Sequence, residues 1–155
     1  MTAPPFQAFL DSHREDVYRF LVAAVGPVDA DDCFQDTFVS ALRAYPRVRA
    51  GSNLRAWVLT IAHRKVVDFH RGRARRPIPV EEPPEIGSEQ RQNGFDPGLW
   101  GLVRELPAKQ RAAVLYRFAG DLGYPEIAQA LRCSEDAARQ NVSEALKKLR
   151  REWKP

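Results

Sequence analysis

Apolar residues recur along the N-terminal half of the chain at steps of three and four positions, the spacing of amphipathic helices. They form three such series. The first apolar series stops at Gly26 and Pro27, the second ends before Pro46, and the third runs into a basic tail. Asp31 and Asp32 are placed to begin the second helix, where carboxylates complement the positive end of the helix dipole. The apolar faces contain Phe6, Phe9, Leu10, His13, Val17, Phe20, Leu21 and Ala24, then Phe34, Phe38, Ala41, Leu42 and Tyr45, then Leu54, Trp57, Val58, Ile61, Ala62 and Phe69.

The C-terminal half predicts a second helical unit. Pro107 suits a helix start because it lacks the N–H that would be unpaired there. From there Val114, Leu115 and Phe118 are expected to face inward until Gly120. A short helix is predicted around residues 125–131, then a turn, then a last helix with Ser134 as its N-cap. The buried face of that last helix is predicted to contain Ala138, Val142, Ala145, Leu149 and Trp153.

The segment between the two units has a different composition. Five of the twelve prolines fall between Pro77 and Pro97, and residues 77–99 carry five acidic residues against one basic residue. Such a segment cannot sustain a helix, so it predicts a linker, with a packed irregular segment as the alternative. The predicted fold is therefore all-α. It has a three-helix domain at 1–76, a Pro-rich acidic linker at 77–99 and a helical domain at 100–155.

Length and composition exclude several classes of protein. No apolar run approaches the ~18–20 residues that a membrane span requires, and residues 1–5 lack the pattern of a secretion signal. Cys33 and Cys133 form no Cys-x-x-Cys pair, and no second ligand stands at ligand spacing from His13 or His63. His13 is expected at the edge of the core and His63 on the surface. A cytoplasmic protein without membrane insertion, metal or cofactor is predicted. No nucleophile–base pair is present, so the chain is not predicted to be an enzyme.

Charge is distributed unevenly along the chain. Residues 1–76 carry twelve Lys and Arg against eight Asp and Glu, and residues 100–155 carry eleven against seven, so each unit has a net charge of +4. Two basic units joined by an acidic connector suggest a polyanionic partner contacted at two places. Solubility alone is the alternative explanation of such charges.

The C-terminal unit has the spacing of a helix-turn-helix. Residues 126–131 precede a three-residue turn, and the small Ala128 allows two helices to cross closely, with Ile127, Leu131 and Cys133 filling the crossing. Arg and Gln can reach base edges in the major groove, and lysines suit phosphates. A plain helical hairpin with a solvated face is the alternative. The outward face is predicted to carry Asp136, Arg139, Gln140, Ser143, Lys147 and Arg150.

The N-terminal unit offers a second candidate nucleic-acid surface. The loop at 47–53 combines Arg and Asn, which can contact the exposed edges of an unstacked base. Trp57 lies on the core face of the third helix, so it is interpreted as a packing residue and not as a wedge between bases. Taken alone, this loop is better explained as basic without a specific role.

Taken in order, these motifs resemble those of bacterial sigma factors of the small extracytoplasmic-function (ECF) group. Residues 31–38 resemble the family's helix that binds core RNA polymerase, and residues 54–62 with the basic tail resemble its −10 promoter helix. Residues 106–114 and the helix-turn-helix resemble its −35 domain. The resemblance covers nearly the whole chain. It implies a sigma factor that directs promoter recognition, DNA melting and transcription initiation without catalysing a reaction. One departure is Arg132, which replaces the turn glycine that a left-handed backbone favours.

The resemblance also implies roles for individual residues. Asp32, Gln35 and Asp36 would bind core polymerase. The −10 DNA would contact Arg47, Arg49, Ser52, Asn53, Arg55, Arg64, Lys65 and Arg71. The −35 DNA would contact Ser134, Arg139, Gln140, Asn141, Ser143, Lys147 and Lys148.

Two other functions remain open from the sequence. One is a stand-alone helix-turn-helix regulator, which has no need of the surface formed by Asp32, Gln35 and Asp36. The other is a sigma-like protein that sequesters a partner, which a weakly basic recognition helix would suit. The partners expected for a sigma factor are core RNA polymerase and promoter DNA. An anti-sigma factor is a further partner that the resemblance allows.

Overall fold

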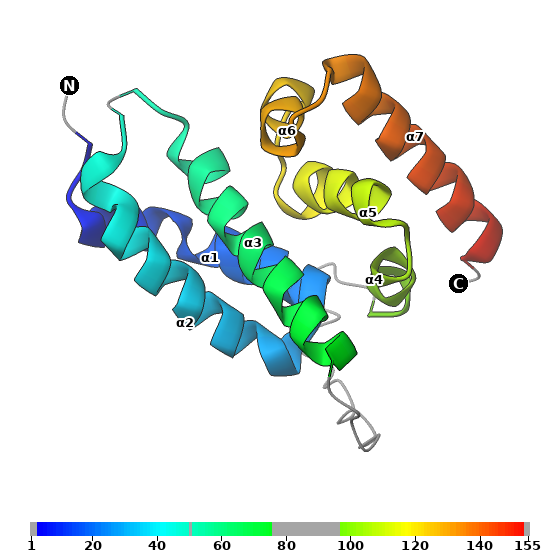
Figure 1. Ribbon diagram of the computed structural model, residues 1–155, viewed down its shortest axis with the longest axis horizontal. Helices are drawn as coiled ribbons and strands as arrows, with labels where there is room; N and C mark the ends of the chain where they lie inside the picture. The colour runs from blue at the N-terminus through cyan, green and yellow to red at the C-terminus, as the bar shows by residue number, and fades with distance from the viewer. Residues whose placement is uncertain (1–2, 50, 76–96, 154–155) are drawn as a thin grey trace.

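The computed structural model describes residues 3–49, 51–75 and 97–153. These residues form only helices and turns, which confirms the predicted all-α class (Figure 1). The elements are α1 (Phe6–Val25), α2 (Pro27–Ala44), the 3₁₀ turn η1 (Tyr45–Arg47), α3 (Leu54–Arg75), α4 (Pro97–Arg104), α5 (Ala108–Val114), the π-helical turn η3 (Leu115–Ala119), α6 (Tyr124–Leu131) and α7 (Glu135–Glu152). Within these ranges, no helix combines the length and apolar character needed to cross a bilayer.

The first three helices pack against one another around an aromatic cluster. The ring centroid of Phe9 lies 5.1 Å from that of Tyr45, 5.7 Å from that of Trp57 and 6.3 Å from that of Phe38, so all three helices and η1 meet at this ring. Trp57 is half-buried in this cluster, as its predicted packing role requires. The cluster fixes where α3 begins, and therefore where the basic loop before it lies.

The second helix ends before Pro46 as predicted, but it begins earlier than predicted. It begins at Pro27, one turn before Asp31, because Gly26 adopts φ +89° and turns the chain, and proline is tolerated in the first turn. Only Asp29 lies in the first turn, so the predicted placement of Asp31 and Asp32 at the helix start is wrong. Leu42 was expected in the core and is 55% exposed. It faces away from α1 and α3.

The C-terminal region contains one helix that was not predicted. α4 includes the last three residues of the predicted linker, 97–99, and linker residues 77–96 lie outside the described part of the chain. α4 buries Val103, and its neighbour Leu106 is also buried. Phe118 was expected to face inward and is 52% exposed instead.

The two helical regions are in direct contact. Figure 1 shows α4 to α7 gathered on one side of the α1–α3 bundle, with α5 and α6 next to α3. Residues of both regions belong to one continuous core, in which Tyr116 of η3 is 1% exposed and contacts α1 and α3. This contact between the regions was not predicted from the sequence.

Candidate functional site

The exposed face of α2 carries a mixed row of polar and apolar side chains. Asp32, Gln35 and Asp36 are all exposed, as expected for residues that contact a partner. Val28, Val39 and Leu42 share their face, since residues 28, 32, 35, 39 and 42 follow a repeat of four and three positions. The exposed fractions of the three apolar side chains are 61%, 48% and 55%. We call Val28, Asp32, Gln35, Asp36, Val39 and Leu42 the α2 row.

The apolar members of the α2 row were not identified from the sequence. The repeat of four and three residues that they follow is the one by which a helix presents a seam to a second helix. Leu42 was assigned to the core, and the sequence signal that was overlooked is this second apolar row on the same helix. The row is suited to a helical partner that carries basic or amide side chains opposite Asp32 and Asp36.

The loop before α3 presents its predicted residues to solvent. Arg47, Arg49 and Ser52 are exposed, and Gly51 adopts φ +81°, which turns the loop. Asn53 caps the N-terminus of α3, because its Oδ1 accepts a hydrogen bond of 3.1 Å from the backbone N–H of Ala56 in the first turn. Its amide nitrogen, a donor that this cap does not use, is the part of Asn53 suited to contact a base.

The α3 residues predicted to hold DNA divide into two groups. Arg64 and Arg71 are exposed and Lys65 is half-buried, so these three lie within reach of a ligand. Arg55 instead points toward the C-terminal region, where its Nη2 donates a hydrogen bond of 2.6 Å to the carbonyl of Gly120. Its guanidinium also lies 3.7 Å from carboxylate oxygens of Asp16 and Asp121. The guanidinium of Arg55 is therefore engaged by groups of the protein in this arrangement.

His63 also faces the C-terminal region and not the solvent. It is half-buried, with its ring centroid 5.1 Å from that of Tyr116, so its expected surface position is wrong. Burial, together with smaller contributions from the positive charges of Arg111 and His70, lowers the pKa of His63 to about 4. His63 is thus neutral at physiological pH. His13 lies half-buried beside Phe9, at the edge of the core as expected.

Residues 124–152 form a helix-turn-helix with the predicted turn. Ile127 and Ala128 are buried where α6 crosses α7, and the backbone N–H of Cys133 donates to the carbonyl of Ala128 at 3.0 Å. Arg132 adopts the left-handed conformation, with φ 55° and ψ 49°, at the position where glycine was expected. Ser134 caps α7, because its Oγ accepts a hydrogen bond of 3.0 Å from the N–H of Ala137.

The outward face of α7 is exposed as predicted. Arg139, Gln140, Ser143 and Lys147 are exposed, while Asn141 and Lys148 are half-buried. Asn141 turns back on its own helix, where its Nδ2 donates to the carbonyl of Ala137 at 3.1 Å. Its predicted contact with a base would therefore require a different rotamer.

Arg139 is held by three neighbours. Its guanidinium lies 3.7 Å from Glu135 and 3.8 Å from Asp136, and its Cζ lies 5.0 Å from the centroid of the Tyr124 ring. Arg117 lies over the same ring, 4.7 Å from its centroid. Tyr124 and Arg117 were not identified from the sequence, since they lie outside the last helix and reach Arg139 only through the fold.

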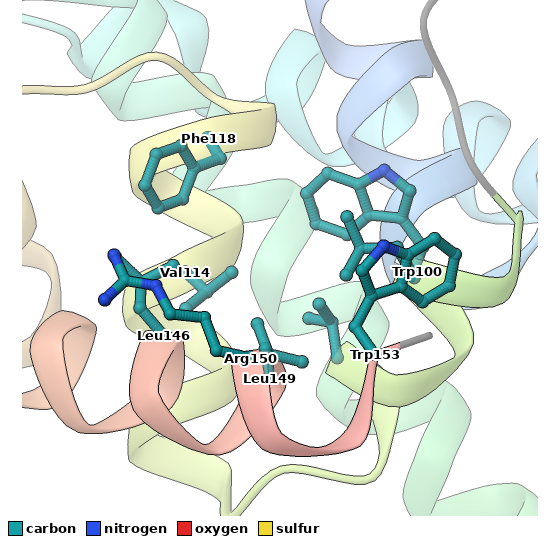
Figure 2. A pocket seen from close by; sticks show the side chains of 9 residues that line it. Trp100, Val114, Phe118, Leu146, Leu149, Arg150 and Trp153 are labelled. Atoms are coloured by element: carbon teal, nitrogen blue, oxygen red, sulfur yellow. The ribbon is translucent and has the colours of Figure 1, made fainter. Parts of the chain in front are cut away.

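A groove of about 300 Å³ lies on the C-terminal region, between α4, α5 and α7. Figure 2 shows Phe118 at one end of this groove and Trp100 and Trp153 at the other, with Arg150 at its edge. Its lining is otherwise apolar and includes Leu99, Val103, Val114, Leu146 and Leu149.

Comparison with known proteins identifies the family. The Sigma-70 region 2 family matches residues 9–76, and the Sigma-70 region 4 family matches residues 99–149. The chain belongs to the sigma-70 family. The region 2 match, which covers the α2 row and the loop before α3, distinguishes this sigma factor from a stand-alone helix-turn-helix regulator.

Curated relatives place this sigma factor in the ECF group. It is 34% identical over 157 residues to the ECF RNA polymerase sigma factor SigD of Mycobacterium tuberculosis, covering 92% of this chain and 74% of the relative. It is 31% identical over 144 residues to the ECF sigma factor SigC of the same species, covering 90% and 78%. An ECF sigma factor directs RNA polymerase to promoter DNA and initiates transcription, so these are the function and partners of this protein.

Solved structures share its fold. The sigma factor RpoE of Bartonella quintana, solved in complex with the anti-sigma factor NepR, superposes with a TM-score of 0.74 at 24% identity, covering 94% of both chains. CnrH, solved in complex with the cytosolic domain of CnrY, superposes with a TM-score of 0.70 at 22% identity, covering 93% of this chain and 84% of the other.

Proposed function

We propose that this sigma factor binds core RNA polymerase through the α2 row and binds promoter DNA through the loop before α3 and the outward face of α7. The observation that carries the proposal is the exposure of Val28, Val39 and Leu42 in line with Asp32 and Gln35. Three apolar side chains on one helix face expose surface that a partner helix would bury, and each contributes free energy of binding when it does so. The flanking carboxylates set the orientation of the partner.

Gel filtration with core RNA polymerase tests this surface. The wild-type chain is expected to co-elute with core polymerase, whereas Gln35→Ala combined with Asp36→Arg is expected to elute separately at the same concentrations. The chain offers a matched control on α1, where the exposed Gln7 donates a hydrogen bond of 3.1 Å to Asp11. Gln7→Ala combined with Asp11→Arg changes the same residue types and is expected to co-elute. Equal co-elution of both double variants would contradict the assignment.

A second variant separates the apolar part of the row from its charges. Leu42→Ser removes exposed apolar surface without opening a cavity, so the melting temperature is expected to change little while affinity for core polymerase falls. Phe38→Ser, one turn earlier on the buried face, is expected to destabilise the fold instead. Unchanged affinity of Leu42→Ser would restrict the interface to the polar residues.

For the −10 element, we propose that Arg47, Arg49, Ser52 and Asn53 contact an unstacked base and its neighbours. Arg64, Lys65 and Arg71 then hold the strand through its phosphates. The exposure of the two loop arginines and the free amide nitrogen of Asn53 support this division. Arg55 belongs to the same set, although its Nη2 donates a hydrogen bond to the Gly120 carbonyl.

For the −35 element, we propose that Arg139 and Gln140 contact base edges. Ser134, Asn141 and Ser143 would add polar contacts, and Lys147 and Lys148 would contact phosphates. Arg139→Ala is expected to lower transcription from a promoter with an intact −35 element while leaving polymerase binding unchanged. Lys147→Ala is expected to weaken binding to all sequences and to make the affinity less dependent on salt. If Lys147→Ala lowered only transcription that depends on the −35 element and Arg139→Ala weakened binding to all sequences, the base-contacting and phosphate-contacting roles would be exchanged.

In this proposal the chain performs no chemical step itself. DNA opening draws on the binding energy of captured bases and of polymerase contacts, so neither a cofactor nor a metal is required. We assign polymerase binding and the −10 element to residues 1–76 and the −35 element to residues 100–155, with 77–99 as the connection. The site of action is the cytoplasm, where the polymerase works.

An anti-sigma factor is a further proposed partner. The complexes of Bartonella quintana RpoE with NepR and of CnrH with CnrY support it, since both sigma factors share this fold. A candidate anti-sigma domain added before core polymerase is expected to prevent co-elution. Co-elution that is unaffected by a bound domain would contradict an inhibitory role for that domain.

A further inference from the structure

One acidic side chain lies on the face of α7 proposed to contact −35 DNA. Glu144 is exposed, one turn after Gln140 and three positions before Lys147, so the three side chains share one face of the helix. A carboxylate on this face repels phosphates and lowers the affinity for DNA of any sequence. Among the groups that DNA presents in its grooves, only hydrogen-bond donors on base edges can pair with it.

The other acidic residues of α7 differ from Glu144 in position and in partners. Glu135 and Asp136 lie in the first turn, where they complement the helix dipole and approach Arg139 to 3.7 and 3.8 Å. Glu152 is the last residue of the helix, beyond the residues proposed to contact DNA. Glu144 lies in the middle of the helix, and within the described ranges no Lys or Arg forms an ion pair with it. Its negative charge is therefore not balanced by an ion pair.

Two amide groups hold the Glu144 carboxylate in place. Nε2 of Gln140 donates to its Oε1 at 3.2 Å, and Nε2 of Gln110 in α5 donates to its Oε2 in a long hydrogen bond of 3.5 Å. The second donor comes from another helix, so the carboxylate is fixed by more than a pair along α7. Each carboxylate oxygen has two lone pairs and uses one of them here. Both oxygens therefore remain able to accept a hydrogen bond from a ligand.

A carboxylate held in this way distinguishes the four bases by the polarity of their hydrogen-bonding groups. In the major groove guanine presents two acceptors, and thymine presents an acceptor and a methyl group, so neither offers a donor. Adenine presents its amino group beside the N7 acceptor, which repels the second carboxylate oxygen. Cytosine presents its N4 amino group without an acceptor of its own beside it. The chemistry of the carboxylate therefore favours cytosine.

We propose that Glu144 is a specificity-determining residue, which selects a cytosine in the −35 element by accepting a hydrogen bond from its N4 amino group. The inference deepens the proposed −35 role of α7 and rests on it. Gln140 acts beside it, because its second amide N–H and its Oε1 match the N7 and N6 groups of adenine. Residues 140 and 144 are about 6 Å apart along the helix axis, and one base pair occupies about 3.4 Å. The two selected positions are therefore expected to lie one or two base pairs apart.

A promoter library with a randomised −35 element tests this assignment. Holoenzyme is assembled from core RNA polymerase and the full chain, and the DNA that it binds is sequenced. The wild type is expected to prefer cytosine at one position by about tenfold, the discrimination that a matched side chain and base provide. Glu144→Ala is expected to lose the preference at that position alone. It is also expected to bind all sequences more tightly, because a charge that repels phosphates has been removed.

Two further variants identify the contact. Glu144→Gln keeps the shape of the side chain and adds a donor, so the preference is expected to move from cytosine to adenine at the same position. Gln140→Ala is expected to change the preference one or two base pairs away. Glu152→Ala removes the same charge from the exposed end of α7 and serves as the matched control, which is expected to keep the preferences of the wild type. Circular dichroism reports whether each variant remains helical.

Three results would contradict the inference at different levels. Preferences that are unaltered in Glu144→Ala but altered in Arg139→Ala would overturn the role of Glu144 and leave the −35 role of α7 standing. Equal tightening by Glu144→Ala and Glu152→Ala, with unaltered preferences, would reduce Glu144 to a charge that repels DNA without selecting a base. Preferences that are unaltered in Arg139→Ala, Gln140→Ala and Glu144→Ala alike would withdraw the proposed −35 role of α7, and the inference with it.

Discussion

Arg139 of the last helix lies over the aromatic ring of Tyr124 in α6, with 5.0 Å between its Cζ and the ring centroid. The opposite helix of the helix-turn-helix thus positions the side chain proposed to contact −35 bases. Glu135 and Asp136 restrain the same guanidinium from its own helix. A restrained arginine loses less conformational entropy when it binds a base.

The first prediction concerns this stacking. Tyr124→Ala is expected to lower the preference for an intact over a scrambled −35 element about two- to fivefold, since an exposed cation–π contact is worth about 0.5–1 kcal/mol. Tyr124→Phe keeps the ring and is expected to retain the preference. Fluorescence anisotropy with the two DNA duplexes measures the ratio. Loss of preference in Tyr124→Phe would point to the hydroxyl group and not to stacking.

The second prediction concerns the cap of α3. Asn53→Ala removes the Oδ1 acceptor of the Ala56 N–H and is expected to lower the free energy of unfolding by about 1 kcal/mol. Ser52→Ala, at the preceding exposed position, is expected to have little effect on stability. Urea denaturation of both variants makes the comparison. Equal stability of the two variants would show that the cap contributes nothing measurable.

The third prediction concerns pH. The pKa of His63 is lowered to about 4 in the fold, chiefly by burial, whereas an unfolded histidine has a pKa near its ordinary value of 6.5. The unfolded chain therefore binds this proton first, so stability is fully present above about pH 6.5 and falls as the pH drops toward 4. The loss between pH 7.5 and 5 is expected to be on the order of 2 kcal/mol.

A variant that lacks only His63 isolates this effect. His63→Gln is expected to flatten the dependence of the melting temperature on pH over that interval. A smaller dependence is expected to remain, because burial also lowers the pKa of His13. Arg111 and His70 oppose protonation of His63 in addition to its burial, so Arg111→Gln is expected to reduce the pH dependence without abolishing it. An unaltered pH profile in His63→Gln would contradict the assignment.

The fourth prediction concerns the two cysteines. Burial raises the pKa of Cys33 to about 11, with further contributions from Asp36, Asp29 and Asp32, so little thiolate forms at neutral pH. Cys133 is half-buried. Iodoacetamide at pH 8 is expected to alkylate Cys133 well before Cys33, as peptide mass spectrometry would show. Alkylation of Cys33 at an equal rate would indicate that α2 opens locally.

Periodicity predicted most of the helices, and its failures have physical causes. α2 has two apolar rows, one toward the core through Phe38 and one toward solvent through Val28 and Val39, and spacing alone cannot tell which row is buried. α4 begins with Pro97 and Gly98 and contains Gly101, which have poor helix propensity, so its packing through Val103 decides its structure.

The candidate site was predictable where side chains face solvent and not where they meet another region. Arg64 and Arg139 lie on the polar faces to which their helical positions assigned them, and both are exposed. Arg55 occupies the polar side of α3 as well, but its partner is the backbone carbonyl of Gly120. A backbone acceptor leaves no signature in a sequence, because every residue carries one.

The π-helical turn η3 makes the domain contact sensitive to insertions and deletions. Its widened turn, closed by a hydrogen bond of 2.9 Å from the Gly120 N–H to the Leu115 carbonyl, accommodates one residue more than an α-helical turn. Deleting one residue there would restore regular α-helix and rotate the residues beyond it by about 100° relative to those before it. Homologues that lack this extra residue would keep the helix-turn-helix but present a different side chain to α3. Gain or loss of a single codon at this turn therefore decides whether the two regions fit each other.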